Sequence, residues 1–202
     1  KYLSLPDGLV SIGRHAFHGC DKLDSVSLPD GLVSIGNCAF GYCAFTSIIL
    51  PASLTNIEAY AFEGCQSLKS VTLPNGITKI STGLFHGCSQ LLRVSFGEKL
   101  TRIGAYAFQS TDLKSVTIPD GVTAIDMFAF SFCELTSLSI PSSVEFIGAY
   151  AFEQCNDLTT INFNGTKAQW KKVHKGNMWN FNVSTNEVSC TNGSVSFTES
   201  DI

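Results

Sequence analysis

A period of 22 or 23 residues runs through most of this chain, and it restricts the possible folds more than any other feature. Aligning the chain on a recurring apolar residue, usually followed by proline, places repeat starts at Leu5, Leu28, Leu50, Leu73, Phe96, Ile118 and Ile140, with a partial unit at Phe163. A repeat of this length cannot bury its own apolar face. The period therefore predicts a solenoid in which each coil packs on its neighbours.

Three columns of the alignment are apolar in every repeat and predict the core. One column is entirely isoleucine (Ile12 to Ile147), a second is entirely phenylalanine (Phe17 to Phe152), and a third holds Leu, Ile or Val (Leu9 to Val144). Stacked coils bring like residues together, so these ladders form one continuous core with ring contacts from coil to coil. A composition of 44% hydrophobic and 15% charged residues suits such a core and argues against disorder.

The segment before each proline predicts a short strand. Residues 23–28 and 68–73 alternate apolar with polar side chains, which is the period of a half-buried strand. Proline ends the pairing in six of the seven repeats because it has no N–H group, and Asp-Gly or Asn-Gly then supplies a turn in four of them. For the Ala-Phe-x-Gly-Cys stretch we predict a helical or 3₁₀ turn on the opposite side.

The unit L-x-x-V-x-L-P-x-x-V-x-x-I-x-x-x-A-F-x-G-C resembles the BspA-like, or Treponema-type, class of leucine-rich repeat over residues 3–163. The resemblance implies an α/β-type repeat solenoid, a right-handed coil with a parallel strand ladder. We predict a solenoid of seven repeats over residues 1–163 and a C-terminal cap over residues 164–202. Because the chain begins inside a repeat, we expect the N-terminal part of the solenoid and a leader to be missing.

Most of the eight cysteines share one column of the repeat, which argues against a disulfide framework. An inward column of thiols behaves as a set of small buried hydrophobes, and disulfides between coils would distort a regular ladder. We expect free thiols there, no bond between Cys38 and Cys190, and no zinc site, since Cys-x-x-Cys spacing is absent. The column holds Cys20, Cys43, Cys65, Cys88, Cys133 and Cys155, with Thr111 in the fifth repeat.

After the last repeat the composition shifts to tryptophan, lysine and asparagine. Residues 166–176 predict a short helix with a threonine N-cap and a C-terminal glycine. Residues 188–197 predict a β-hairpin around a Thr-Asn-Gly-Ser turn. An open solenoid end would expose the core ladders, so we expect this region to close it, with Trp170 and Trp179 as lids.

Catalytic, metal and cofactor sites are not expected. His18 and His86 share a column but lie three repeats apart, too far to bind one metal, and the acidic residues that follow the prolines are too sparse for calcium. No G-x-S-x-G, P-loop or Rossmann fingerprint occurs. The net charge of −4, without a nucleic-acid-binding signature, argues against DNA or RNA partners, and the absence of a long apolar run argues against membrane insertion.

The outward face of the strand ladder is the remaining place for binding. Most positions there are small and hydroxylated, and the exceptions are Ile49, Leu92 and Arg93, with Lys69 and Lys114 on either side. Exposed apolar residues beside arginine are typical of protein contact sites, so these five form the predicted binding patch. Incidental variation on a solvated strand explains them equally well.

Binding of a protein ligand is the predicted function, because a solenoid offers an extended rigid surface that suits large ligands. The resemblance implies cell-surface or secreted bacterial proteins, some of which bind host matrix proteins such as fibronectin and fibrinogen or help cells attach. Adhesion is therefore the leading hypothesis, by analogy of fold. A structural spacer that presents another domain is one alternative. Glycan binding is a second, disfavoured because the strand face carries no Trp or Tyr.

Overall fold

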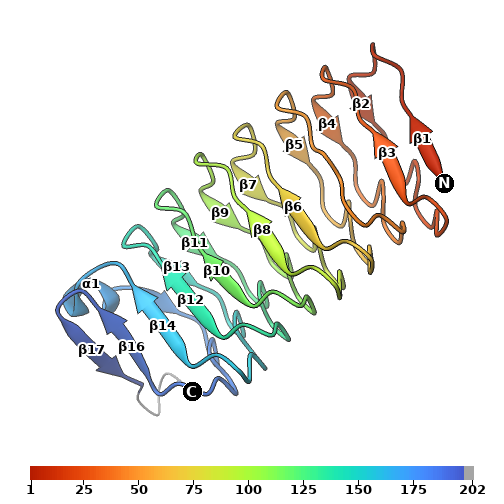
Figure 1. Ribbon diagram of the computed structural model, residues 1–202. Coiled ribbons are helices and arrows are strands. Elements are labelled where there is room, and N and C mark those ends of the chain that lie inside the picture. The colour runs from red at the N-terminus through yellow and green to blue at the C-terminus, as the bar shows by residue number, and fades with distance from the viewer. Residues whose placement is uncertain (198–202) are drawn as a thin grey trace.

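In the computed structural model, which describes residues 1–197, each repeat forms one coil of a solenoid (Figure 1). The colour passes steadily from red to blue along the axis, so the coils follow one another in sequence order. The predicted solenoid with parallel strands is confirmed. Residues 198–202, which belong to the predicted cap, lie outside the described residues.

The strands that precede the prolines form a first ladder along one side of the solenoid. Neighbours are parallel and in register, so that Val71 of one coil pairs with Val94 of the next. The ladder is divided into three sheets, β1-β3, β6-β8 and β10-β12-β14-β16-β17. Its parallel members are β1 (Tyr2–Ser4), β3 (Ser25–Ser27), β6 (Ser70–Thr72), β8 (Arg93–Ser95), β10 (Ser115–Thr117), β12 (Ser137–Ile140), β14 (Thr160–Phe163) and β16 (Glu187–Cys190).

A second ladder of two-residue strands follows the isoleucine column and was not predicted from the sequence. Each of its strands ends on the column residue, which is isoleucine in all but the last. The strands pair in two sheets, β2-β4-β5 and β7-β9-β11-β13-β15. They are β2 (Ser11–Ile12), β4 (Ser34–Ile35), β5 (Asn56–Ile57), β7 (Lys79–Ile80), β9 (Arg102–Ile103), β11 (Ala124–Ile125), β13 (Phe146–Ile147) and β15 (His174–Lys175).

The Ala-Phe-x-Gly-Cys side of each coil corrects the prediction of a helical or 3₁₀ turn. Over the described residues this side consists of turns whose alternate N–H groups bond the next coil, as from His15 to the Asn37 carbonyl at 2.9 Å and from Phe17 to the Ala39 carbonyl at 2.8 Å. Two positions per coil take positive φ, such as His15 at 55° and Gly19 at 72°. A helix would direct these N–H groups along its own axis, so bonding between coils replaces it.

The predicted phenylalanine column forms a stacked ladder of rings through the core. From Phe17 to Phe152, successive rings lie 5.2–5.7 Å apart with interplanar angles of 4–16°. The isoleucine column is buried beside it over its whole length. The core is thus a set of parallel side-chain rows that each coil extends by one residue.

All eight cysteines are free, in agreement with the expectation for the column. Each buried thiol donates to the carbonyl of the phenylalanine one coil earlier, as from Cys65 Sγ to the Phe40 oxygen at 3.2 Å and from Cys88 Sγ to the Phe62 oxygen at 3.1 Å. The column therefore joins coils by hydrogen bonds as well as by packing. Cys20 departs from the expectation of burial because it is exposed in the first coil.

The chain beyond the last repeat covers the end of the core. Trp179 lies edge-on to Phe152 at 6.1 Å, and Trp170 lies 5.1 Å from Phe163. The predicted helix over 166–176 is too long, since α1 spans Lys167–Trp170 and the chain then enters β15 as an eighth coil. Strand β17 (Gly193–Ser196) pairs with β16 in antiparallel fashion, which ends the parallel ladder.

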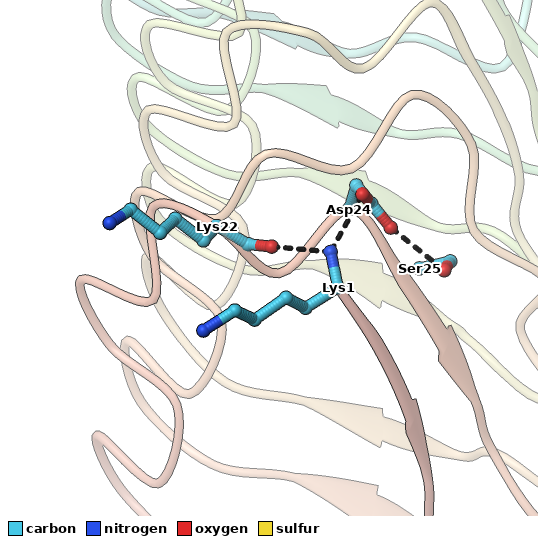
Figure 2. Close-up of polar contacts among 4 residues, drawn as sticks. All are labelled: Lys1, Lys22, Asp24 and Ser25. Atoms are coloured by element: carbon cyan, nitrogen blue, oxygen red, sulfur yellow. Dashed lines mark hydrogen bonds and ion pairs between the residues drawn. The ribbon is translucent and has the colours of Figure 1, made fainter.

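In the first coil, the main-chain nitrogen of Lys1 makes polar contacts with the chain that leads into β3 (Figure 2). This nitrogen, and not the side-chain Nζ, donates to the Lys22 carbonyl at 2.6 Å and to the Asp24 carboxylate at 2.7 Å. The Ser25 hydroxyl donates to the second Asp24 oxygen at 2.9 Å. The bond from the Lys1 amino group, with that from Ser25, lowers the pKa of Asp24. These contacts fasten β1 to the chain that leads into β3.

Candidate functional site

The predicted strand-face residues are exposed on the first ladder. Ile49 is 84% exposed and Leu92 is 42% exposed, which are large fractions for aliphatic side chains. Lys69, Arg93 and Lys114 are exposed as well. All five predicted residues are therefore accessible to a partner.

The first ladder is interrupted at two places, and both contain predicted residues. Residues 48–50 form no strand, and β8 is not paired with β10. At each break the turn after the cysteine column becomes one residue shorter than in the coil before, as in the step from Cys88-Ser89-Gln90-Leu91 to Thr111-Asp112-Leu113. A parallel ladder needs evenly spaced N–H and C=O groups on both strands, and the shorter turn changes how the chain enters the strand.

A surface groove opens at each break. The larger, of about 490 Å³, lies between β8 and β10 and is called here the Arg93 groove; it is lined by Leu92, Arg93, Val94, Ser95, Phe96, Ser115, Thr117 and Pro119. The Ile49 groove, of about 440 Å³, is lined by Ile48, Ile49, Leu50, Ala52, Thr72, Pro74 and Asn75. The two grooves share no lining residue. The structure thus divides the predicted patch into two parts, with Leu92 and Arg93 in one and Ile49 in the other.

The two lysines of the patch flank the Arg93 groove without lining it. The Leu92 amide donates to the Lys69 carbonyl at 3.0 Å, so Lys69 belongs to the adjacent coil. Lys114 pairs with Glu134, and this hydrogen bond raises the pKa of Lys114. Among residues 1–197, neither Lys69 nor Arg93 takes part in an ion pair. Two uncompensated cations therefore adjoin Leu92 on a chain whose net charge is −4.

A row of aromatic side chains that was not predicted from the sequence lies on the turn side of the coils. Tyr106, Phe128 and Tyr150 stack with ring centroids 5.1 and 5.0 Å apart and interplanar angles of 10° and 3°. The exposed side chains of Met127 (43%) and Phe132 (52%) come from the same turns. The signal was present in the alignment, since one column reads His15, Cys38, Tyr60, Gly83, Tyr106, Phe128 and Tyr150.

A third groove, of about 420 Å³ and called here the tyrosine groove, lies on this side; it is lined by Cys38, Tyr60, Glu63, His86, Tyr106 and Gln109. Gly83 interrupts the aromatic column between its two tyrosines, and a Cβ there would lie 2.1 Å from the Tyr60 ring. The Tyr60 ring therefore occupies space that a larger residue at 83 would need. Glu63 faces His86 at 3.4 Å, so carboxylate and imidazole stand beside the aromatic surface.

The sequence matches a known repeat family along nearly all of its length. The profile of the BspA type leucine rich repeat region matches residues 1–112 and 80–196, in six copies. The chain belongs to the BspA-type leucine-rich-repeat family. This confirms the resemblance drawn from the repeat unit, and leucine-rich repeats of this type are protein-interaction modules.

Solved structures of bacterial proteins share the fold. The leucine-rich-repeat protein of T. pallidum is 30% identical with a TM-score of 0.72, and the match covers 88% of this chain and 85% of that one. A leucine rich cell surface protein from Faecalibacterium prausnitzii A2-165 is 26% identical with a TM-score of 0.51; the match covers 86% of this chain but 62% of that one, which is less than two thirds of its length. A leucine-rich repeat protein from Bacteroides ovatus is 25% identical with a TM-score of 0.52, over 92% of this chain and 67% of that one. No curated protein matches the chain.

Within residues 1–197, no helix has both the length and the apolar character needed to cross a bilayer.

Proposed function

We propose that this BspA-type protein is an extracellular or cell-surface binding module of a bacterium, without catalytic activity, that attaches to host matrix proteins or to other cells. Its solenoid over residues 1–163 supplies the binding surface, and residues 164–202 cap the core. The observation that supports the proposal is the coincidence of exposed Leu92 and Arg93 with one of the two breaks in the strand ladder.

The chemistry of the Arg93 groove favours a protein partner that presents acidic residues beside an apolar side chain. Leu92 offers apolar surface at the rim, while Arg93 and Lys69 offer positive charge that no carboxylate of the described chain neutralises. Arginine next to exposed apolar surface is enriched where binding energy concentrates in protein interfaces. An acidic segment would neutralise these cations without the penalty of an unpaired buried charge.

The test is binding of the purified chain to immobilised fibronectin, fibrinogen and a mucin, beside the double variant Leu92→Ser/Arg93→Ser. Loss of two side chains at the centre of a contact is expected to cost at least about 2 kcal/mol, or roughly 30-fold in Kd. Binding is also expected to weaken with added salt, because the cations of the groove are exposed.

The matched control is Val10→Ser/Lys99→Ser, which removes one exposed apolar and one cationic side chain, neither of which lines a strand-face groove. This control should bind as the unaltered chain does. Saturable binding that the Leu92→Ser/Arg93→Ser variant retains would move the site to another surface. Absence of binding to every ligand would support the alternative of a structural spacer.

Glycan binding is a second candidate function, favoured by the tyrosine groove. Sugars pack their C–H faces on aromatic rings and hydrogen-bond to carboxylate, imidazole and amide groups, and Tyr60, Tyr106, Glu63, His86 and Gln109 supply all of these. The argument against glycans rested on the absence of Trp and Tyr from the strand face. That premise was wrong, because Tyr2 pairs with Ser25 in the first ladder and is 69% exposed, and the argument does not apply to the turn side.

A glycan array probed with the labelled chain and with the Tyr106→Ala variant separates the two functions. Glycan binding that is lost in Tyr106→Ala and kept in Leu92→Ser/Arg93→Ser would assign a second site. If the labelled chain binds no glycan on the array, the strand face remains the sole binding surface of this proposal.

A further inference from the structure

Three side chains with metal-binding atoms meet on the turn side of the first two coils. They are His15, His18 and Cys38. Each offers one ligand atom, a ring nitrogen from each histidine and the sulfur of the cysteine, and these three atoms lie within 4.8 Å of one another. His15 and Cys38 occupy the same column in consecutive coils, and the His15 amide bonds the carbonyl of Asn37 at 2.9 Å. Coils in a parallel ladder are about 4.8 Å apart, so the fold itself holds these residues close together.

The position of the His18 ring depends on a small residue in the next coil. Its ring lies edge-on to His15 at 5.0 Å and to Tyr42 at 5.4 Å. A Cβ on buried Gly41 would lie 2.8 Å from Nδ1 of His18, so a larger residue would displace the imidazole. The coil after His18 therefore leaves space for its ring beside Cys38.

We propose that His15, His18 and Cys38 form a zinc site, with water as the fourth ligand. Two imidazoles and a thiolate are the donor set that Zn²⁺ prefers, whereas calcium and magnesium require oxygen ligands, of which the group has none. Zn–N and Zn–S bonds of about 2.0–2.1 and 2.3 Å place tetrahedral ligand atoms about 3.4 Å apart. The atoms must therefore approach by up to about 1.4 Å on binding, which rotation of the two exposed imidazoles allows.

Zinc binding at this position would tie the first coil to the second. Cys38 would bind as the thiolate and release its proton to solvent, while the two histidines bind as neutral imidazoles. In the described chain the first coil is less buried than the coils after it, with Phe17 partly exposed and Cys20 exposed. A ligand shared between coils would oppose fraying there, since binding to the native state alone raises stability by mass action.

This site was not predicted from the sequence, because its ligands follow no recognised metal-binding spacing. Cys38 is 20 residues from His18 and 23 from His15, which is the separation of one coil. Zinc ligands of this kind become neighbours through the repeat period, in the same way as the residues of the core ladders.

The experiment uses the untagged chain, zinc in competition with a chromophoric chelator, and cobalt as a spectroscopic substitute. One zinc per chain is expected, and the cobalt form should show a thiolate-to-cobalt charge-transfer band with the visible bands of four-coordinate cobalt. The variants Cys38→Ser and His18→Ala should each weaken zinc binding by at least about 100-fold. Mutation of residues that only hydrogen-bond to metal ligands already lowers metal affinity by about 10–100-fold, and loss of a ligand should cost more. The charge-transfer band should be absent from Cys38→Ser.

Two further variants separate a built site from casual binding to exposed side chains. Gly41→Ala keeps every ligand but displaces the His18 ring, and it should weaken zinc binding at least 10-fold. His174→Ala/Cys20→Ser removes an exposed histidine and an exposed cysteine outside the group and should bind zinc unchanged. Circular dichroism without metal confirms that each variant is folded. No binding at 100 µM zinc, or binding that Cys38→Ser and His18→Ala retain, would overturn the proposal.

Discussion

Replacement of Phe130 by alanine tests whether the stacked phenylalanine ladder stabilises the solenoid. Phe130 is fully buried between Phe108, 5.2 Å away, and Phe152, 5.5 Å away, with both ring pairs nearly parallel. Truncation of a buried phenylalanine costs about 3–5 kcal/mol, and each lost aromatic pair is worth about 0.5–1.5 kcal/mol. With two stacked neighbours lost, we expect the free energy of unfolding to fall by about 4–5 kcal/mol.

The matched control is Phe17→Ala in the first coil. Phe17 is partly exposed and has one stacked partner among the described residues, Phe40 at 5.2 Å. We expect a loss of about 1–2 kcal/mol there, because part of the ring is already in water and a terminal coil can fray without unfolding the rest. Urea unfolding followed by circular dichroism measures both losses. Equal losses for Phe17→Ala and Phe130→Ala would refute the argument that ring stacking along the ladder sets the cost.

Three other expectations follow from burial and close contact. In the native chain Cys20 should react rapidly with a thiol reagent, whereas the five buried column cysteines should react after unfolding; a native count above three reactive thiols would contradict this. Burial raises the pKa of the Cys65 and Cys133 thiols to about 12, above their ordinary value of 9.0. As the pH rises, these thiols therefore ionise in the unfolded chain before they ionise in the folded one. The free energy of unfolding should be unaffected by them below pH 9 and should fall towards pH 12 by on the order of 1 kcal/mol per thiol per pH unit. Urea midpoints should accordingly be lower at pH 10 than at pH 8. Gly148→Ala, whose Cβ would lie 2.3 Å from the Met127 backbone nitrogen, should lower the thermal midpoint by the equivalent of about 1–3 kcal/mol, while Gly8→Ala, with no atom within 4 Å, should leave it unchanged.

The repeat period was sufficient to predict the strands of the first ladder and the core, because both depend on side-chain columns that recur in every coil, but it did not reveal the second ladder. Phe85 and Ile80 are buried as their columns require. The conformation of the turn side could not be derived in this way. Tyr60 and Tyr106 take a positive φ of 59°, and positive φ is predicted from a sequence mainly where glycine stands. Bonds between coils stabilise that conformation, and they exist only once the coils are stacked.

The candidate surfaces were predictable to different degrees. The exposure of Leu92 followed from its place on the outward strand face, but the groove beside it arises from a turn one residue shorter, which changes the pairing of β8 and β10. The tyrosine groove and the group of His15, His18 and Cys38 depend on contacts between residues about one coil apart or more. Such contacts can be predicted from the sequence only if residues of one turn-side column are treated as neighbours on the surface of the solenoid.

The position of Trp179 over Phe152 also has a consequence for how the protein is made. This tryptophan follows all seven repeats, so each nascent chain that ends earlier displays the bare isoleucine and phenylalanine rows of its newest coil. At about 5–20 residues per second, synthesis from Phe17 to Trp179 takes roughly 8–30 s, and an apolar face stays exposed during that time. A chaperone or a secretion apparatus would meet the same apolar face at every stage, until the closing tryptophans emerge and remove it.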